Sequence, residues 1–168
     1  MLKKMNFLKK IVKQSSSEND IEVLKKNAIE ICDEIFKKKL AHLNTQNYNY
    51  DTKQAVEELG LDQEMIDELV DDYVAQVIRA ISQFDGYMEK LQDSKDNAKE
   101  LDYTLFRELA HKNLGVARNL RIKDAEALLY ELMKKDDLEY LLTCLEALRV
   151  CAIKLRPEVA HKTISSIS

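Results

Sequence analysis

Hydrophobic positions recur along this chain at intervals of three and four residues, the spacing of one face of an α-helix. The longest run falls within 62–91. Its apolar stripe consists of Ile66, Val70, Tyr73, Val77, Ile81, Phe84, Met88 and Leu91. A stripe of this length is typical of the seam along which the helices of a bundle pack. Similar patterns predict further helices over 21–43, 101–120, 124–133 and 138–155.

Capping and helix-breaking residues separate these runs. Asp51 can cap a short helix that Gly60 ends, and Asp62 stands at the start of the long helix. Ser, Asn and Asp residues precede the helix predicted over 21–43. Asp136 with Asp137 marks a break, and Pro157 ends the helix over 138–155. The polar segments 44–50 and 93–99 are predicted to be loops.

An all-α fold follows from these patterns. Three glycines and one proline, in a chain of which 33% of the residues are charged, leave few turn signals for a sheet. A length of 168 residues suits one compact domain. Four long helices with short connections within 50–156 predict an antiparallel up-and-down four-helix bundle. An additional N-terminal helix over 20–43 either extends this bundle or forms a dimer, and 157–168 is predicted to be a C-terminal tail.

The charge of the chain is unevenly distributed. The net charge is −4, yet residues 1–13 contain five lysines and no acidic residue, so the rest of the chain is strongly acidic. An acidic body argues against a nucleic-acid partner. Residues 1–19 are predicted to be a basic, flexible leader. The alternative is that 1–13 forms an amphipathic helix that attaches to an anionic membrane surface.

Three cysteines point to a reducing compartment. Cys32, Cys144 and Cys151 are odd in number and form no close CxxC pair, which favours free thiols in a cytoplasmic protein. No apolar run reaches the roughly 18 residues of a membrane span, and the N-terminus lacks the core of a secretory signal. Cys144 and Cys151 share a helical face with Ala147 and Leu148, so we expect both to be small buried hydrophobic residues.

The helix predicted over 101–120 carries the strongest candidate site. Its apolar sector contains Leu105, Phe106, Leu109, Ala110, Val116, Ala117 and Leu120. His111 lies roughly opposite the centre of that sector. Arg107, one turn earlier, and Arg118, two turns later, fall on the same polar side, and Gly115 follows one turn after the histidine. We therefore expect an exposed histidine between two arginines, and the alternative is a surface histidine without a role.

The sequence around this histidine resembles a known family. Residues 110–120 read Ala-His-Lys-Asn-Leu-Gly-Val-Ala-Arg-Asn-Leu, which is similar to the signature of the histidine-containing phosphotransfer (Hpt) domains of bacterial and fungal phosphorelays. His111, Gly115, Ala117 and Leu120 fall on matching positions. The resemblance covers about 50–156, including the entry at 55–61 and the helix at 124–132. The chain departs from the pattern at Leu114, where the family usually has lysine, at Asn113, which replaces an apolar core residue, and at Arg121, which replaces glycine.

The resemblance implies a function. In such a bacterial two-component phosphorelay, His111 would accept a phosphoryl group from a receiver-domain aspartate, or from a histidine kinase, and pass the group from phosphohistidine to another receiver. The receiver supplies Mg²⁺, so no cofactor and no small-molecule substrate of its own are expected. The sequence shows no Gly-rich phosphate loop or nucleophile elbow, so no intrinsic kinase or hydrolase activity is predicted.

The neighbours of His111 can be assigned roles on this basis. A neutral imidazole is the nucleophile, and nearby positive charge favours that form and attracts phosphoryl oxygens. Arg107 and Arg118 are predicted to replace the missing lysine, with Lys112 as a further candidate nearer the flank. Gly115 leaves room for a receiver surface; the alternative is that it packs against a neighbouring helix. Leu114 is expected outside the core sector, either as a docking contact for the partner or as an ordinary exposed leucine.

Two rival interpretations remain open. Leu114 and Asn113 favour a degenerate Hpt-like adaptor that binds a response regulator or kinase without being phosphorylated. The spacing of Glu108 and His111, repeated by Glu158 and His161, is that of ferritin-like di-iron helices. Because the first pair is predicted to face outward and the second to lie in a tail, no metal site is expected. His42 and His161 are predicted to be solvated surface residues.

Overall fold

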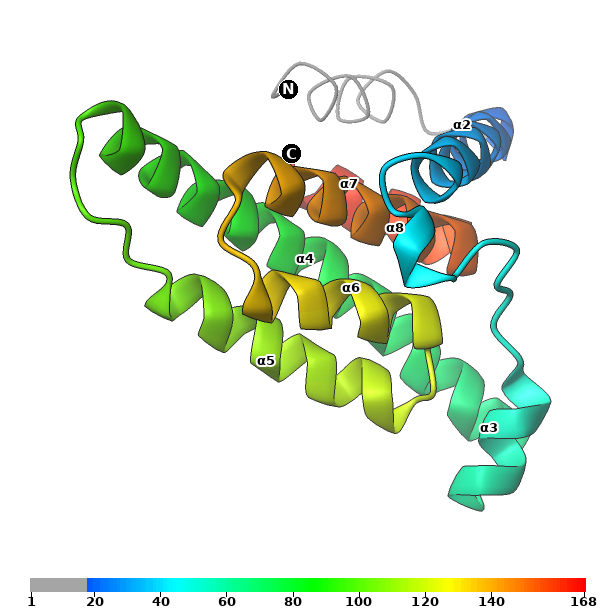
Figure 1. The fold of residues 1–168 in the computed structure, drawn as a ribbon. Coiled ribbons are helices and arrows are strands. Elements are labelled where there is room, and N and C mark those ends of the chain that lie inside the picture. The colour runs from blue at the N-terminus through cyan, green and yellow to red at the C-terminus, as the bar shows by residue number, and fades with distance from the viewer. Residues whose placement is uncertain (1–17) are drawn as a thin grey trace.

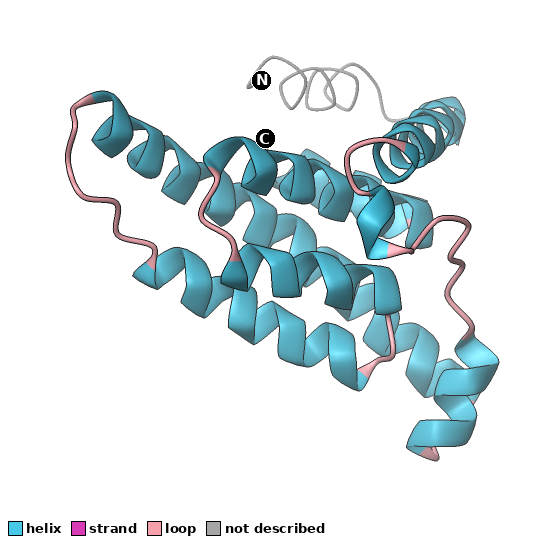
Figure 2. Cartoon of the chain, viewed as in Figure 1, coloured by secondary structure: helices cyan, strands magenta, loops and turns pink. Residues whose placement is uncertain are grey.

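The computed structural model describes residues 18–168, and this part of the chain contains helices and no strand (Figures 1 and 2). The predicted all-α fold is confirmed. The helices are α2 (Glu18–Lys37), the 3₁₀ helix η1 (Ala41–Leu43), α3 (Thr52–Leu59), α4 (Gln63–Asp96), α5 (Thr104–Asn119), α6 (Lys123–Lys134), α7 (Leu138–Leu155) and α8 (Pro157–Ile167). The predicted leader lies outside the described residues apart from Glu18 and Asn19, which begin α2, and so does its membrane-bound alternative.

The predicted caps at Asp51, Gly60 and Asp62 are confirmed, whereas Asn19 and Asp20, predicted to precede the N-terminal helix, lie within α2. The Asp51 carboxylate accepts hydrogen bonds from the backbone N–H groups of Lys53 and Gln54, at 3.0 and 3.4 Å, and so caps α3. Asp62 caps α4 and Asp137 caps α7 in the same way. Gly60 ends α3 with a φ of +68°, in the left-handed region that glycine adopts without steric cost.

Helices α4 to α7 alternate in direction along one axis (Figure 1). The pair α5 and α6 is joined by a tight turn at residues 120–122, and the two helices pack along their length. Helix α7 contacts α2, α4, α6 and α8, and Leu141, Leu145 and Leu148 are fully buried along it. The central position of α7 explains why its sequence is the most continuously apolar of the long helices.

The N-terminal helix is shorter than predicted and joins the main core. Helix α2 ends at Lys37 rather than continuing to Leu43, and a turn and η1 follow it. Leu24, Ala28 and Phe36 are buried in the same cluster as the apolar residues of α7. Within one chain, α2 therefore covers α7 and α8.

The segment predicted to be a C-terminal tail is a helix. Proline is well tolerated in the first turn, where its missing N–H would have no partner, so Pro157 begins α8 as well as following the end of α7. Ala160 and Ile164 are buried where α8 packs against α4 and α7. The prediction that His161 is solvated is wrong: the residue is 8% exposed, because α8 turns it into the molecule.

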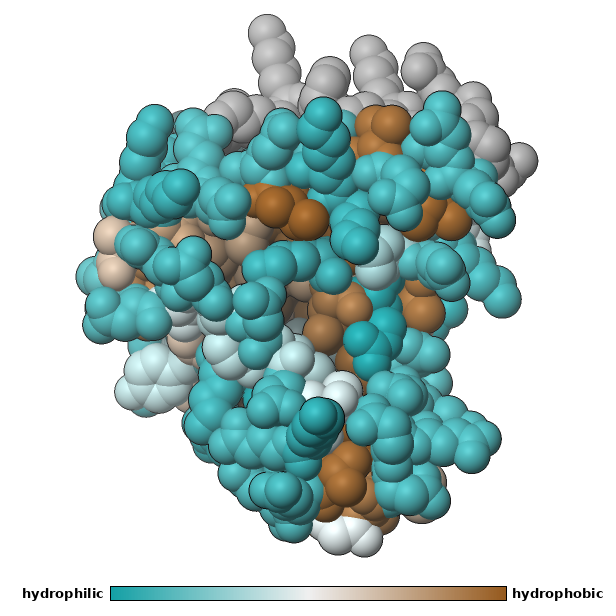
Figure 3. All heavy atoms as spheres, turned by 90° about the vertical axis from the view of Figure 1, so that its right-hand side faces the viewer, coloured by the Kyte–Doolittle hydropathy of each residue, from teal (hydrophilic) through white to brown (hydrophobic). Residues whose placement is uncertain are grey.

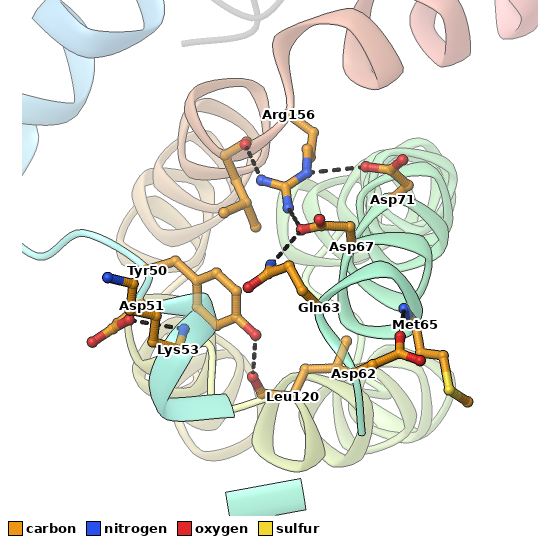
Figure 4. A network of polar contacts seen from close by, with 11 residues as sticks. Tyr50, Asp51, Lys53, Asp62, Gln63, Met65, Asp67, Asp71, Leu120 and Arg156 are labelled. Atoms are coloured by element: carbon orange, nitrogen blue, oxygen red, sulfur yellow. Dashed lines mark hydrogen bonds and ion pairs between the residues drawn. The ribbon is translucent and has the colours of Figure 1, made fainter. Parts of the chain in front are cut away.

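A polar network closes the end of the molecule near the turn between α5 and α6 (Figure 4). Arg156, between α7 and α8, donates hydrogen bonds to Asp67 at 3.1 Å and to Asp71 at 3.0 Å, both on α4. The Tyr50 hydroxyl donates to the carbonyl oxygen of Leu120 at 2.8 Å. The Tyr50 bond fixes the loop before α3 against the turn that follows α5, and the Arg156 bonds fix the junction of α7 and α8 against α4.

Candidate functional site

Helix α5 exposes His111 as predicted. Phe106, Ala110 and Ala117 are buried on its inner face, whereas His111 lies on the exposed side. The buried sector differs from the prediction in its width and centre. Leu105 is 55% exposed, and Asn113 and Leu114 are buried instead.

The prediction that Leu114 lies outside the core is wrong. Its side chain is 2% exposed, and α5 packs against both α4 and α6. The helical wheel of α5 alone could not show this, since the width of a buried sector depends on how many neighbours cover the helix. Leu114 therefore belongs to the core and offers no contact to a partner.

Asn113 faces the core, as its position in the resemblance implies, and its polar groups are paired. Its Nδ2 donates to the carbonyl oxygen of Leu109 at 2.9 Å, and its Oδ1 accepts from Nε2 of Gln76 at 3.3 Å. Burial of the amide is tolerated because both ends have partners. The contact with Gln76 also fixes α5 against α4.

Arg107 and Arg118 lie on the exposed side of α5, but each has a partner of its own. The guanidinium of Arg107 stands 4.9 Å from the centroid of the Tyr103 ring, a cation–π contact. Nε of Arg118 donates to Glu126 on α6 at 3.1 Å. Lys112 is exposed one residue after the histidine. The two arginines thus place positive charge on both sides of His111 along the helix.

Gly115 is exposed with free space around it. A Cβ built on this residue would meet no atom within 4 Å outside its own surroundings in α5. The alternative that Gly115 is a packing site for a neighbouring helix is therefore wrong. The surface one turn after His111 is left flat.

Helix α6 brings further side chains to the level of His111. At one end of the helix pair, the Tyr103 hydroxyl donates to the carbonyl oxygen of Asp136 at 2.7 Å, and at the other Arg118 binds Glu126. Because α5 and α6 are antiparallel, His111 on α5 and Tyr130 on α6 both lie about halfway between these two contacts along the helix pair. Tyr130 is 48% exposed, and Nζ of Lys134 lies 5.7 Å from its ring centroid.

Sequence reasoning missed Tyr130 and Lys134. Tyr130 falls opposite Leu128, Leu129 and Leu132 on a helical wheel, so its exposure was visible in the pattern. Its position at the level of His111 along the helix pair was not, because that position depends on how α5 and α6 pair in space.

Arg121 occupies a strained backbone position. Its φ is +62°, in the region that glycine adopts most readily, and the Hpt resemblance places a glycine here. The guanidinium compensates by donating from Nη1 to the carbonyl oxygens of Arg118 and Asn119 and from Nε to Glu58 of α3. The tight turn between α5 and α6 is thus kept without glycine.

The remaining candidates do not gather around His111. Glu108 and His111 are both exposed on α5, whereas Glu158 is exposed and His161 is buried, so the second pair is divided between surface and interior. Within residues 18–168, no group of three or more His, Cys, Asp or Glu side chains is placed to hold a metal ion. His42 is exposed, and its Nε2 lies 2.9 Å from the Tyr140 hydroxyl.

Comparison of the chain with family models, with curated proteins and with solved structures finds no match. None of the helices described for residues 18–168 combines the length and the apolar content needed to cross a membrane.

Proposed function

We propose that this chain is a phosphoryl carrier of the Hpt type, in which α4 to α7 form the up-and-down bundle and His111 is the phosphoacceptor. The observation that carries the proposal is the position of His111. It is the exposed histidine in the middle of a helix whose opposite face, with Phe106 and Ala117, is anchored in the core. A rigid helix restricts the approach of the imidazole to a bound phosphoryl group, which lowers the entropic cost of transfer.

The chemistry requires little of this chain. A neutral imidazole nitrogen attacks phosphorus, the bond between phosphorus and the aspartate oxygen of the receiver breaks, and the aspartate leaves as a carboxylate. Transfer onward reverses these steps on a second receiver. Mg²⁺ belongs to the receiver, where it neutralises the phosphoryl oxygens.

The surface around His111 suits the approach of a second protein. Gly115 presents no side chain on the same face, so a receiver can come close to the helix axis. Tyr130 on α6 adds an exposed aromatic ring at the level of the histidine, and aromatic rings are enriched in protein interfaces. This face of α5 and α6 is the docking surface of the proposal.

A second candidate function is an adaptor that binds a receiver or kinase without being phosphorylated. It is favoured by Leu114, a buried apolar residue at the position where the family usually has lysine. It is favoured also by the ion pair between Arg118 and Glu126, which partly neutralises one of the two arginines.

The test is transfer of labelled phosphate from receiver domains that have been phosphorylated with acetyl phosphate. We expect acid-labile, base-stable label on the full chain and its loss in His111→Gln. His42→Gln is the matched control, because His42 is also an exposed histidine and should remain dispensable. Binding to a receiver without label would select the adaptor. Label that persists in His111→Gln would overturn the proposed role of the histidine.

A further inference from the structure

Two cysteines that are distant in sequence meet between α2 and α7. The Sγ atoms of Cys32 and Cys151 lie 3.9 Å apart, although the residues are separated by 119 positions. Each cysteine is 6% exposed. Burial accounts for either thiol alone as a small apolar residue. It does not account for their contact, which places two oxidisable sulfur atoms within reach of each other.

Hollows that are partly lined by polar side chains adjoin both thiols. Cys151 lines a cavity of about 210 Å³ together with Tyr48, Asp124 and Lys154. Cys32 lines a smaller neighbouring hollow of about 20 Å³ that shares these three residues. Both hollows are lined by residues of the loop before α3, and on the face seen in Figure 3 hydrophobic groups show between hydrophilic side chains. These hollows are the route by which a small polar oxidant would reach the sulfur atoms.

The surroundings make the two thiols unequal. The hydrogen bond from Cys151 lowers the pKa of Cys32, and the positive charge of Lys154 lowers it further against the effect of burial. The pKa of Cys151 is raised well above its ordinary value by its hydrogen bond to Cys32, by burial and by the negative charge of Asp124. Cys32 is therefore the better source of a thiolate, and Cys151 retains its proton.

Asp124 is placed to receive that proton. It lines both hollows beside the two cysteines, and burial raises its pKa, which makes it a stronger base than an exposed aspartate. Lys154 lies nearby, as its electrostatic effect on Asp124 shows. The four side chains thus have different roles. Cys32 supplies the thiolate and Cys151 the second thiol. Asp124 is the proton acceptor and Lys154 the nearby cation.

We propose that Cys32 and Cys151 are a peroxide-sensitive thiol pair that closes to a disulfide between α2 and α7. The Cys32 thiolate attacks one oxygen of hydrogen peroxide, the O–O bond breaks, and hydroxide leaves, which produces a sulfenic acid on Cys32. Cys151 then gives its proton to Asp124 and attacks the Cys32 sulfur. The S–O bond breaks, and the hydroxyl group takes up a proton and leaves as water. Overall, two thiols and one peroxide give one disulfide and two waters.

The disulfide requires only a small movement. Its S–S bond is about 2 Å long, so the sulfur atoms must approach by about 2 Å from their present separation of 3.9 Å. The crosslink would fasten α2 to α7. The pair is thus a modification site at the junction of the N-terminal helix with the main core.

Cys144 supplies a matched control within the same helix. It lies on α7, is fully buried, and its burial raises the pKa of its thiol to about 12. The sulfur–sulfur contact of 3.9 Å joins Cys32 and Cys151, and Cys144 has no part in it. A reaction driven by general thiol chemistry would include Cys144 once the chain opens, whereas a reaction of the folded pair leaves it unchanged.

The experiment is oxidation of the folded full chain with hydrogen peroxide, followed by alkylation and digestion with trypsin. Cleavage after Lys and Arg places the three cysteines on separate peptides, which span 27–37, 136–149 and 150–154. We expect 27–37 linked to 150–154, reversal of the link by dithiothreitol, and Cys144 recovered as a free thiol. Alkylation of Cys32 before oxidation should be at least about tenfold faster than that of Cys144.

Two variants test the order of the steps. In Cys151→Ser, oxidation should stop at a sulfenic acid on Cys32 that dimedone traps, and in Cys32→Ser the thiol of Cys151 should remain reduced. Circular dichroism establishes that each variant is folded. The proposal is overturned if oxidation of the folded wild-type chain gives no link between 27–37 and 150–154. It is overturned equally if links to Cys144 form as readily as this one.

Discussion

Arg107 and Arg118 place two positive charges on the side of α5 that exposes His111. We predict that the double variant Arg107→Gln, Arg118→Gln transfers phosphate about tenfold more slowly or worse, since the loss of roughly 1.4 kcal/mol of transition-state stabilisation corresponds to a factor of ten. Initial rates of labelling by a phosphorylated receiver measure the effect. The change should be larger for the pair than for Arg118→Gln alone, because Glu126 already offsets part of that charge.

Lys25 and Lys26 provide the control for net charge. Both are exposed on α2, so Lys25→Gln, Lys26→Gln removes the same formal charge at a distance from His111. Equal rates for the two double variants, or no change in either, would show that the arginines do not replace the missing lysine.

Variants of Gly115 test separately the stability of α5 and the access of a receiver to His111. Both Gly115 and Gly86 are exposed within helices with free space for a Cβ, so Gly115→Ala and Gly86→Ala should each stabilise the fold by about 0.5–1 kcal/mol in urea titrations. Only a bulky replacement of Gly115 should slow phosphoryl transfer to His111. Gly115→Phe is expected to slow labelling, and Gly86→Phe, on α4, to leave it unchanged. A receiver that labels both phenylalanine variants at the wild-type rate would place docking elsewhere.

Between elements, α4 and α7 share a buried ion pair. Nη2 of Arg149 donates to Oδ2 of Asp85 at 3.0 Å, and the two side chains are 7% and 13% exposed. Removing one partner of such a pair leaves a buried charge, so Arg149→Met should cost about 3–5 kcal/mol of unfolding free energy. Replacement of both residues, with Asp85→Leu added, should recover most of the loss. Chemical denaturation of the single and double variants gives the comparison.

An exposed ion pair at the C-terminal end of α2 provides a reference for this result. Nζ of Lys38 lies 3.8 Å from Glu34, and the side chains are 75% and 64% exposed. Solvent screening makes such a contact worth less than about 1 kcal/mol, so Lys38→Met should have little effect. Similar losses for Arg149→Met and Lys38→Met would contradict the assignment of a buried pair between α4 and α7.

At the scale of the whole molecule, α8 packs into the core and is not a separate tail. Ile164 is 7% exposed against the other helices, whereas Ile167, one turn later, is 44% exposed. Ile164→Ala should therefore destabilise the protein by about 2–5 kcal/mol, and Ile167→Ala by less than about 0.5 kcal/mol. Thermal or urea unfolding of the two variants tests whether α8 folds together with the rest. Equal effects would mean that α8 is not part of the cooperative unit.

The sequence alone determined the helical class, most helix boundaries and the exposure of His111. Each depends on interactions within a few residues: the periodicity of Ile66 to Leu91, the caps at Asp51, Asp62 and Asp137, and the position of His111 opposite the apolar sector. Such interactions are encoded locally. These features can therefore be predicted from the sequence without knowledge of which helices pack nearby.

Only the tertiary structure decided what covers each helix. It buried Leu114 in the core, turned His161 inward on α8 and placed Tyr130 at the level of His111. It also brought Cys32 to 3.9 Å from Cys151 across 119 positions. The physical reason is that burial and contact depend on the neighbours that surround a residue. Periodicity along one helix gives the direction of a side chain but not the identity of what it meets.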